Sequence, residues 1–178
     1  MVHRPRFVFL AACLAAFLAA LLGPVAARAQ MPNRYGPPVG VEAARKIAAT
    51  AVAEARKHGW TVAVAVVDAA GDLVFFERID HTQVASATVA QEKARTAVRF
   101  KRPTKAFEEA LAGGRQAILG LPGVTPLEGG IPLLVDNKIV GAIGVSGATS
   151  QQDGVCAQAA VDALARSQPR AAASPARK

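Results

Sequence analysis

A lysine interrupts the apolar stripe of a predicted helix. The segment "TQVASATVAQEKARTAVRF" has a helical period, and one stripe contains Ser86, Val89, Lys93, Thr96, Ala97 and Phe100. An unpaired buried charge is costly, so such a lysine either extends its ammonium to solvent or pairs with an acid. Both interpretations of Lys93 remain open. If it is buried, the candidate partner is Glu128.

Glu128 stands out because it lies in an apolar stretch, "VTPLEGGIPLLV". It is followed by Gly129 and Gly130, and glycines let the backbone approach a neighbour or a ligand closely. The carboxylate either caps backbone N–H groups or serves as the acid or base of a site.

A third candidate feature is "GVSGATSQQD", where a turn containing Ser146 and Gly147 leads into a helix. Free N–H groups and the helix dipole favour an anion at such a start. Ser150 and Asp153 fit a capping pair there. The preceding hairpin should bring its flanks to one edge of the sheet, so we expect Glu128 to lie near Ser150. Together with Lys93, these residues predict a pocket for a small carboxylate.

The remaining chemically versatile residues are two histidines and a cysteine beyond the first 29 residues. His58 ends a predicted helix and His81 follows "FFERID", and either could ligate a metal or haem iron. Cys156 shares a face with alanines and is predicted to be packed. The sequence has no HExxH, CxxC, CxxCH, P-loop or nucleophile-elbow motif. Metal-dependent and Ser- or Cys-dependent hydrolysis therefore lack support, and whether any reaction is catalysed stays open.

The predicted elements are two hairpins separated by helices. Helices are expected from residue 41 to a stop at Gly59, through the stripe around Lys93, from Pro103 to Gly113 and from about residue 149 to 167. Strands are expected at 60–67, 73–79, 131–135 and 139–145. Two antiparallel hairpins disfavour a doubly wound parallel sheet and favour an α+β fold, an antiparallel sheet with helices on its faces.

The two ends of the chain differ from its body. Residues 1–29 have a basic start, an apolar run and a small-x-small "ARA" site, as a secretory signal peptide does. We expect cleavage after Ala29 and a periplasmic or secreted protein without a membrane span, with an uncleaved anchor as the alternative. Residues 30–40 are predicted as a flexible lead-in, 41–166 as one domain, and 167–178 as a disordered basic tail.

The charge of the chain is concentrated at its ends. The formal net charge is +8, from 21 basic and 13 acidic residues. Without Arg4, Arg6 and Arg28 of the signal segment, 18 basic residues remain, and four of these follow Ala165. The body therefore has 14 basic and 13 acidic residues, which argues against a nucleic-acid surface. Cys156 is the only cysteine after the signal segment, so an internal disulfide is not expected.

Three stretches resemble one protein family. "VAVVDAAGDLVFFERID", "QEKARTAVRFKRPT" and "LPGVTPLEGGIPLLVDNKIVGAIGVSGATSQQDGVCAQAAVDAL" are similar to the GlcG/HbpS family of haem-binding proteins, which includes the C-terminal domain of PduO-type proteins. The resemblance covers about residues 41–165. It implies a profilin-like or PAS-like antiparallel sheet of about five strands with helices packed on it. It also implies homo-oligomers, octamers among them.

The resemblance implies a haem or other tetrapyrrole ligand, in haem handling or sensing, with a corrinoid as the weaker candidate. His81 would ligate the iron, with His58 as the second choice, and Arg78 with the Arg95/Arg99 pair could meet the propionates. No catalytic motif is carried over. Two alternatives stay open. One is a binder or enzyme for a small carboxylate at the pocket described above, and the other is an interaction module.

Overall fold

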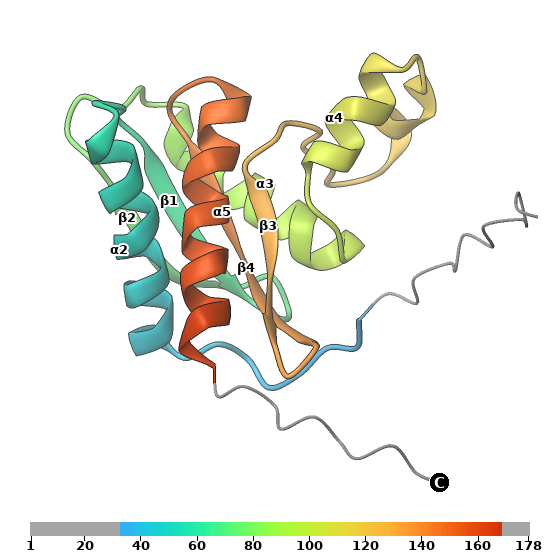
Figure 1. Cartoon of the computed structure of the whole chain (residues 1–178). Helices are drawn as coiled ribbons and strands as arrows, with labels where there is room; N and C mark the ends of the chain where they lie inside the picture. Colours follow the sequence, from blue (N-terminus) through green and yellow to red (C-terminus); the bar gives the residue numbers. More distant parts are fainter. Residues whose placement is uncertain (1–32, 169–178) are drawn as a thin grey trace, which may run out of the picture. The chain divides into compact units, whose positions relative to one another are not determined.

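The computed structural model of the protein describes residues 33–168 (Figure 1). The predicted signal peptide and nearly all of the predicted tail lie outside the described residues. Within residues 33–168, no helix is both long enough and apolar enough to cross a membrane.

The described chain contains four α-helices, one 3-10 helix and four strands. The helices are α2 (Val41–Lys57), α3 (Ser86–Phe100), α4 (Lys105–Ala112) and α5 (Ser150–Ser167), with η1 (Gln116–Gly120) after α4. The strands are β1 (Ala63–Asp68), β2 (Leu73–Arg78), β3 (Gly130–Val135) and β4 (Lys138–Ser146). Both predicted hairpins are confirmed, β1 with β2 and β3 with β4.

The four strands form one antiparallel sheet in the order β2-β1-β4-β3. This confirms the predicted antiparallel α+β architecture, with four strands in the described residues where about five were expected. The place beside β4 beyond the end of β1 is taken by the segment before α2. Tyr35 bridges Ile139 there, and Gly36 N–H donates to Ile139 O at 2.8 Å. Pro37 and Pro38 follow and have no N–H to extend the pairing.

The same contacts involve the lead-in, residues 30–40, which was expected to be flexible. Its described part, residues 33–40, is hydrogen-bonded to β4: Ile139 N–H donates to Arg34 O, and Val39 N–H donates to Val140 O, each at 2.8 Å. The lead-in therefore borders the sheet.

Helices cover both faces of the sheet. Figure 1 shows α2 and α5 side by side on one face, where the core includes Val62, Val64, Val66, Ile143, Val145 and Cys156. On the other face α3 packs on Ala63, Ala65, Val67 and Ala142 through its own alanines. Successive β1 residues point to opposite faces. The strand is therefore apolar and buried from Ala63 to Val67, as predicted for a central strand, and Asp68 at its end is partly buried.

Small residues bring α3 close to the sheet. A side chain at Gly144 of β4 would collide with the backbone of Ala90 and Ala94 on α3. This close packing fixes the height of α3 above β4, and thereby the position of Lys93 between them.

Candidate functional site

Lys93 is buried and forms an ion pair across the core. Its side chain is 2% exposed, and its Nζ lies 2.8 Å from Asp153 Oδ2, with Asp153 3% exposed. The ammonium also donates to Val145 O at 3.0 Å. The prediction that Glu128 is the partner of Lys93 is therefore wrong. The first turn of α5, rather than the loop before β3, supplies the acid.

The start of α5 explains why Asp153 is available for this pair. The predicted cap, Ser150 with Asp153, is wrong: Thr149 is the N-cap residue and forms a capping box with Gln152. Gln152 N–H donates to Thr149 Oγ1 at 3.3 Å, and Thr149 N–H donates to Gln152 Oε1 at 3.1 Å. The spacing Thr-x-x-Gln in "TSQQ" is the sequence signal that would have identified this cap and released Asp153 for another role.

The surroundings of Asp153 have opposing effects on the pKa of its carboxyl group. Burial raises the pKa of the Asp153 carboxyl, while the Lys93 ammonium and the N–H groups of Ala148 and Gly147 oppose that rise. Ala148 N–H donates to Asp153 Oδ1 at 3.1 Å, so both carboxylate oxygens are hydrogen-bonded. The pair thus joins α3, the end of β4 and the start of α5.

Glu128 lies beside the first turns of α5, as its place at the flank of the β3–β4 hairpin predicts. Its side chain packs against Gly154, where any larger residue would collide with it. Its carboxylate accepts a hydrogen bond from Lys105 of α4 at 2.8 Å, which raises the pKa of Lys105. Its backbone N–H donates to Glu108. The loop is therefore tied to α4 and α5 by polar contacts.

The two glycines after Glu128 serve close packing around Lys93. A side chain at Gly130 would collide with the Lys93 backbone, and one at Gly129 would crowd Val145 O, Asp153 and the Lys93 Nζ. Gly129 also has φ +124°, a left-handed region that favours glycine. Contacts within the chain therefore account for the Glu-Gly-Gly pattern at residues 128–130, which had suggested a ligand site.

A pocket of about 320 Å³ does lie beside this loop. It is lined by Pro103, Lys105, Glu128, Gly129, Gly130, Ile131, Gly154, Val155 and Gln158. Lys93 does not line it, because the Gly129–Gly130 backbone separates its ammonium from the pocket. Its charged lining residues are Lys105 and Glu128, which are paired with each other, and Glu108 and Glu109 of α4 lie near Lys105. Three carboxylates against one ammonium would repel a carboxylate ligand.

Two further predicted residues of that pocket have structural partners. Ser146 is buried, and its Oγ lies 3.3 Å from Ser86 Oγ on α3. Gly147 packs against the backbone of Thr61 and Val62, with φ +153°. Ser150 belongs to the first turn of α5 and does not line the pocket.

The arginines proposed for propionates do not meet at one place. Arg95 forms an ion pair with Glu92 at 2.7 Å and donates to Gly71 O at 3.3 Å. Arg99 packs against Gly71 and Gly123. Arg78 is paired with Ala63, at the opposite end of the β1–β2 hairpin from Gly71. At about 3.3 Å per residue, the length of β2 separates Arg78 from the other two.

The histidines lie at the same end of the sheet as Arg78. His58 follows α2 and stacks on Trp60 with ring centroids 4.4 Å apart, and its Nε2 is 3.2 Å from Glu54. His81 follows β2, is exposed and has φ +65°. Ile79 N–H donates to Val62 O, which joins the end of β2 to the segment after Trp60. No cluster of three or more His, Cys, Asp or Glu side chains that could hold a metal ion occurs in residues 33–168.

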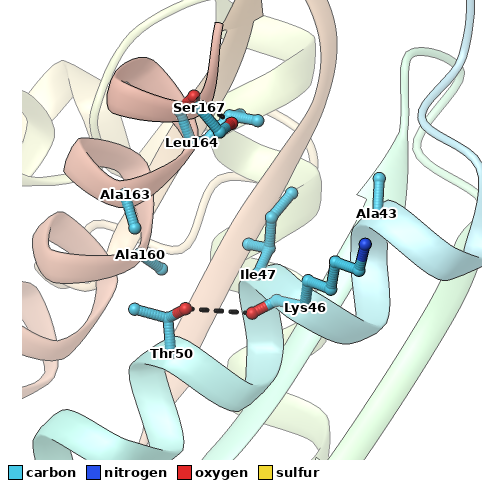
Figure 2. A pocket seen from close by; sticks show the side chains of 8 residues that line it. All are labelled: Ala43, Lys46, Ile47, Thr50, Ala160, Ala163, Leu164 and Ser167. Atoms are coloured by element: carbon cyan, nitrogen blue, oxygen red, sulfur yellow. Dashed lines mark hydrogen bonds between the residues drawn. The ribbon is translucent and has the colours of Figure 1, made fainter.

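An apolar groove runs between α2 and α5. Figure 2 shows its lining, Ala43, Lys46, Ile47, Thr50, Ala160, Ala163, Leu164 and Ser167, around a volume of about 360 Å³. A neighbouring pocket of about 370 Å³ shares Ala43 and Leu164 with it and extends to the β3–β4 turn. Neither pocket is lined by a histidine. Lys46 is the only residue with a charged side chain that lines the first.

Cys156 is packed, as its position predicts. It lies in the α2/α5 core with no exposed surface. Burial, together with the nearby Asp153 and Glu54 carboxylates, raises the pKa of its thiol to about 11. The thiol is therefore protonated at neutral pH and is a poor nucleophile.

The fold and these sites define a small α+β protein with a four-stranded antiparallel sheet and no metal cluster in its described part. The family model described as "Haem degrading protein HbpS-like" matches residues 39–162. The chain belongs to this HbpS-like family, in agreement with the resemblance seen in its sequence.

Three relatives support this assignment. Protein GlcG of Escherichia coli K12 is 45% identical over 103 residues, which are 58% of this chain and 77% of that protein. A solved double mutant of Streptomyces reticuli HbpS is 36% identical, with a TM-score of 0.67, over 80% of this chain and 97% of the other. The solved PduOC:Heme complex is 27% identical, with a TM-score of 0.64, over 71% and 94% of the two chains.

Proposed function

We propose that this chain is an exported tetrapyrrole-binding protein whose ligand is haem. The observation that carries the proposal is the fold shared with the PduOC:Heme complex, within a family that also includes HbpS. Export rests on the signal-peptide pattern of residues 1–29, and it places the protein in the periplasm or outside the cell. The proposal includes a role in haem handling or sensing, which the family resemblance implies for exported members, and we expect the protein to work as a homo-oligomer.

The size of the pockets constrains how haem is held. The three pockets described above have volumes of about 320 to 370 Å³. These lie at the lower end of the 300–1,000 Å³ that is typical of ligand pockets. A haem has four pyrrole rings and two propionates and is too large to be enclosed in one of them. Neither histidine lines any of the three, and His81 is exposed, so we infer an open site at that end of the sheet, in which one face or edge of the macrocycle stays accessible.

His81 is the better axial ligand of the two histidines. His58 is held by its stacking on Trp60 and by its contact with Glu54, whereas His81 is exposed on the turn after β2. Arg78, also exposed, comes three residues earlier at the same end of the sheet and is the cation that would meet a propionate. In this proposal Arg95 and Arg99, which lie at the other end of the hairpin, do not contact the same haem.

A haemin titration tests the proposal. The purified protein should shift and sharpen the Soret band of haemin and saturate at one haem per chain, while hydroxocobalamin should give no saturable change. No Soret shift at stoichiometric haem would overturn the proposal. A parallel thermal-shift screen with small organic acids checks the alternative ligand class, for which the acidic pocket mouth predicts no stabilisation.

A further inference from the structure

The haem site proposed above leaves the groove between α2 and α5 unused. Its most deeply buried lining residues are Ile47, which is 4% exposed, and Ala160, which has no exposed surface. Ala43 of α2 and Ala163 of α5 also line it, and larger side chains at these positions would fill it (Figure 2). The groove is therefore a hollow with an apolar lining between two packed helices.

The polar side chains of this groove are Thr50, Ser167 and Lys46, and the two hydroxyls are already hydrogen-bonded within the chain. Thr50 Oγ1 donates to Lys46 O at 3.0 Å, and Ser167 Oγ donates to Leu164 O at 2.7 Å. Lys46 is exposed, and its ammonium forms no ion pair within the part of the chain that the structure describes. The groove therefore offers a ligand apolar contacts and one positive charge.

The groove continues into the neighbouring pocket, since both are lined by Ala43 and Leu164. On α2 the groove reaches from Ala43 to Thr50, about 10 Å at a rise of 1.5 Å per residue. The neighbouring pocket has one charge of each sign, Asp136 and Lys138, and its other lining residues are Pro37, Pro38, Val39, Gly40, Val135 and Val140. The two hollows together are therefore long and largely apolar, with a net positive charge.

A single-chain carboxylate has the matching chemistry, an apolar chain with one negative charge at its end. Burial of the chain would remove its methylene groups from water, and the carboxylate would accept a hydrogen bond from Lys46 Nζ. We propose that the groove between α2 and α5 is a binding site for a medium-chain fatty acid. The carboxylate lies at Lys46, and the alkyl chain runs past Ala43 toward the β3–β4 turn.

This fatty-acid site is separate from the proposed haem site. The groove lies toward the start of α2, whereas His58 follows the end of the same helix. The proposal therefore goes beyond haem binding, and it is tested on the haem-free protein, so that failure of the haem proposal leaves the test intact.

Calorimetric titration tests the ligand class. Decanoate should bind saturably at one per chain, and decanol, which has the chain without the charge, should bind at least about threefold more weakly. Octanoate and hexanoate should bind about two- to fourfold more weakly for each CH₂ removed, and acetate should not bind, because the apolar chain supplies most of the affinity. No saturable binding of decanoate, or equal affinities of decanoate and decanol, would overturn the proposal.

Two matched pairs of variants on α2 locate the site. Lys46→Gln should remove the difference in affinity between decanoate and decanol, whereas Lys57→Gln, at an exposed lysine that lines neither pocket, should preserve it. Ala43→Phe should obstruct the passage between the two pockets and weaken both ligands by at least about tenfold. Ala49→Phe is its control, because Ala49 is also exposed on α2 but lines neither pocket. Circular dichroism verifies the fold of each variant.

Decanoate affinities that are unchanged in Lys46→Gln and in Ala43→Phe would place the fatty acid elsewhere and overturn the proposal. One equivalent of haemin should leave the decanoate affinity of the wild type unchanged. Displacement of decanoate by haemin would show that the groove holds haem, and would contradict a separate fatty-acid site.

Discussion

At the residue scale, the main feature of the core is one ion pair. Lys93 and Asp153 are almost completely buried and hydrogen-bonded, and they connect three elements. Both charges are desolvated, so the pair adds little to the net free energy of unfolding. Removal of one partner is nevertheless strongly destabilising, because it leaves the other charge buried and unpaired.

The variant Lys93→Met tests this role. It leaves the Asp153 carboxylate buried without its counter-ion, and we expect the free energy of unfolding to fall by about 3–5 kcal/mol, measured by denaturant titration. The matched control is Lys105→Met, which breaks the exposed pair with Glu128 and should cost much less. Replacing both partners, Lys93→Met with Asp153→Leu, should recover part of the loss. A Lys93→Met protein as stable as Lys105→Met would contradict the account.

Cys156 gives a prediction for pH. Its pKa rises from the usual 9.0 to about 11 in the folded protein, because burial disfavours the thiolate. Between these two values the unfolded chain has lost the thiol proton and the folded chain has kept it. The contribution of Cys156 to stability is therefore complete below pH 9 and declines as the pH rises toward 11.

Denaturant midpoints of the wild type and of Cys156→Ala, measured from pH 8 to about 11, check this. The alanine variant has a smaller side chain in the core, which lowers stability by an amount independent of pH. We expect the stability difference between the two proteins to shrink as the pH rises. A constant difference over this range would show that the thiol titrates as it does in the unfolded chain.

At the element scale, local patterns predicted the helices and both hairpins. The β-branched run of β1, the turn residues and the helical period around Lys93 are each visible within about twenty residues of sequence. The pairing of β1 with β4 joins residues about eighty positions apart, such as Ala63 and Ser146, and no local pattern specifies it. That pairing positions α5 over Lys93, which is why the sequence indicated a buried lysine but not its acid.

The same limit applies to the glycines. Their number around Glu128 was visible in the sequence, whereas their reason is contact with distant segments: Gly130 with Lys93, Gly144 with Ala90, Gly154 with Glu128. Only the folded chain distinguishes a glycine that makes room for a ligand from one that makes room for a helix.

The start of α5 provides a test at this scale. Thr149→Ala removes one half of the capping box, and we expect a loss of about 1 kcal/mol in the free energy of unfolding. Ser150→Ala is the control, since the Ser150 side chain has no capping role, and it should be nearly neutral. The reverse order of the two effects would favour the cap that was predicted from sequence.

At the scale of the whole molecule, the family resemblance contributed more than the composition did. It predicted the antiparallel sheet covered by helices and the relation to HbpS and PduO proteins, which the comparisons confirm. The predicted site residues form no single constellation: Lys93 is sealed in the core, Glu128 belongs to an acidic pocket mouth, and the arginines lie at two ends of the sheet. We propose the histidine end of the sheet, with His81, as the haem site.

The absorbance spectrum of the haem-saturated His81→Ala variant, beside that of His58→Ala, tests this central claim most directly. We expect His81→Ala to lose the Soret position and intensity of the wild-type complex and to bind haem at least about tenfold more weakly, a loss of about 1.4 kcal/mol. His58→Ala should match the wild type. A His81→Ala spectrum and affinity identical to those of the wild type would contradict the proposed ligand.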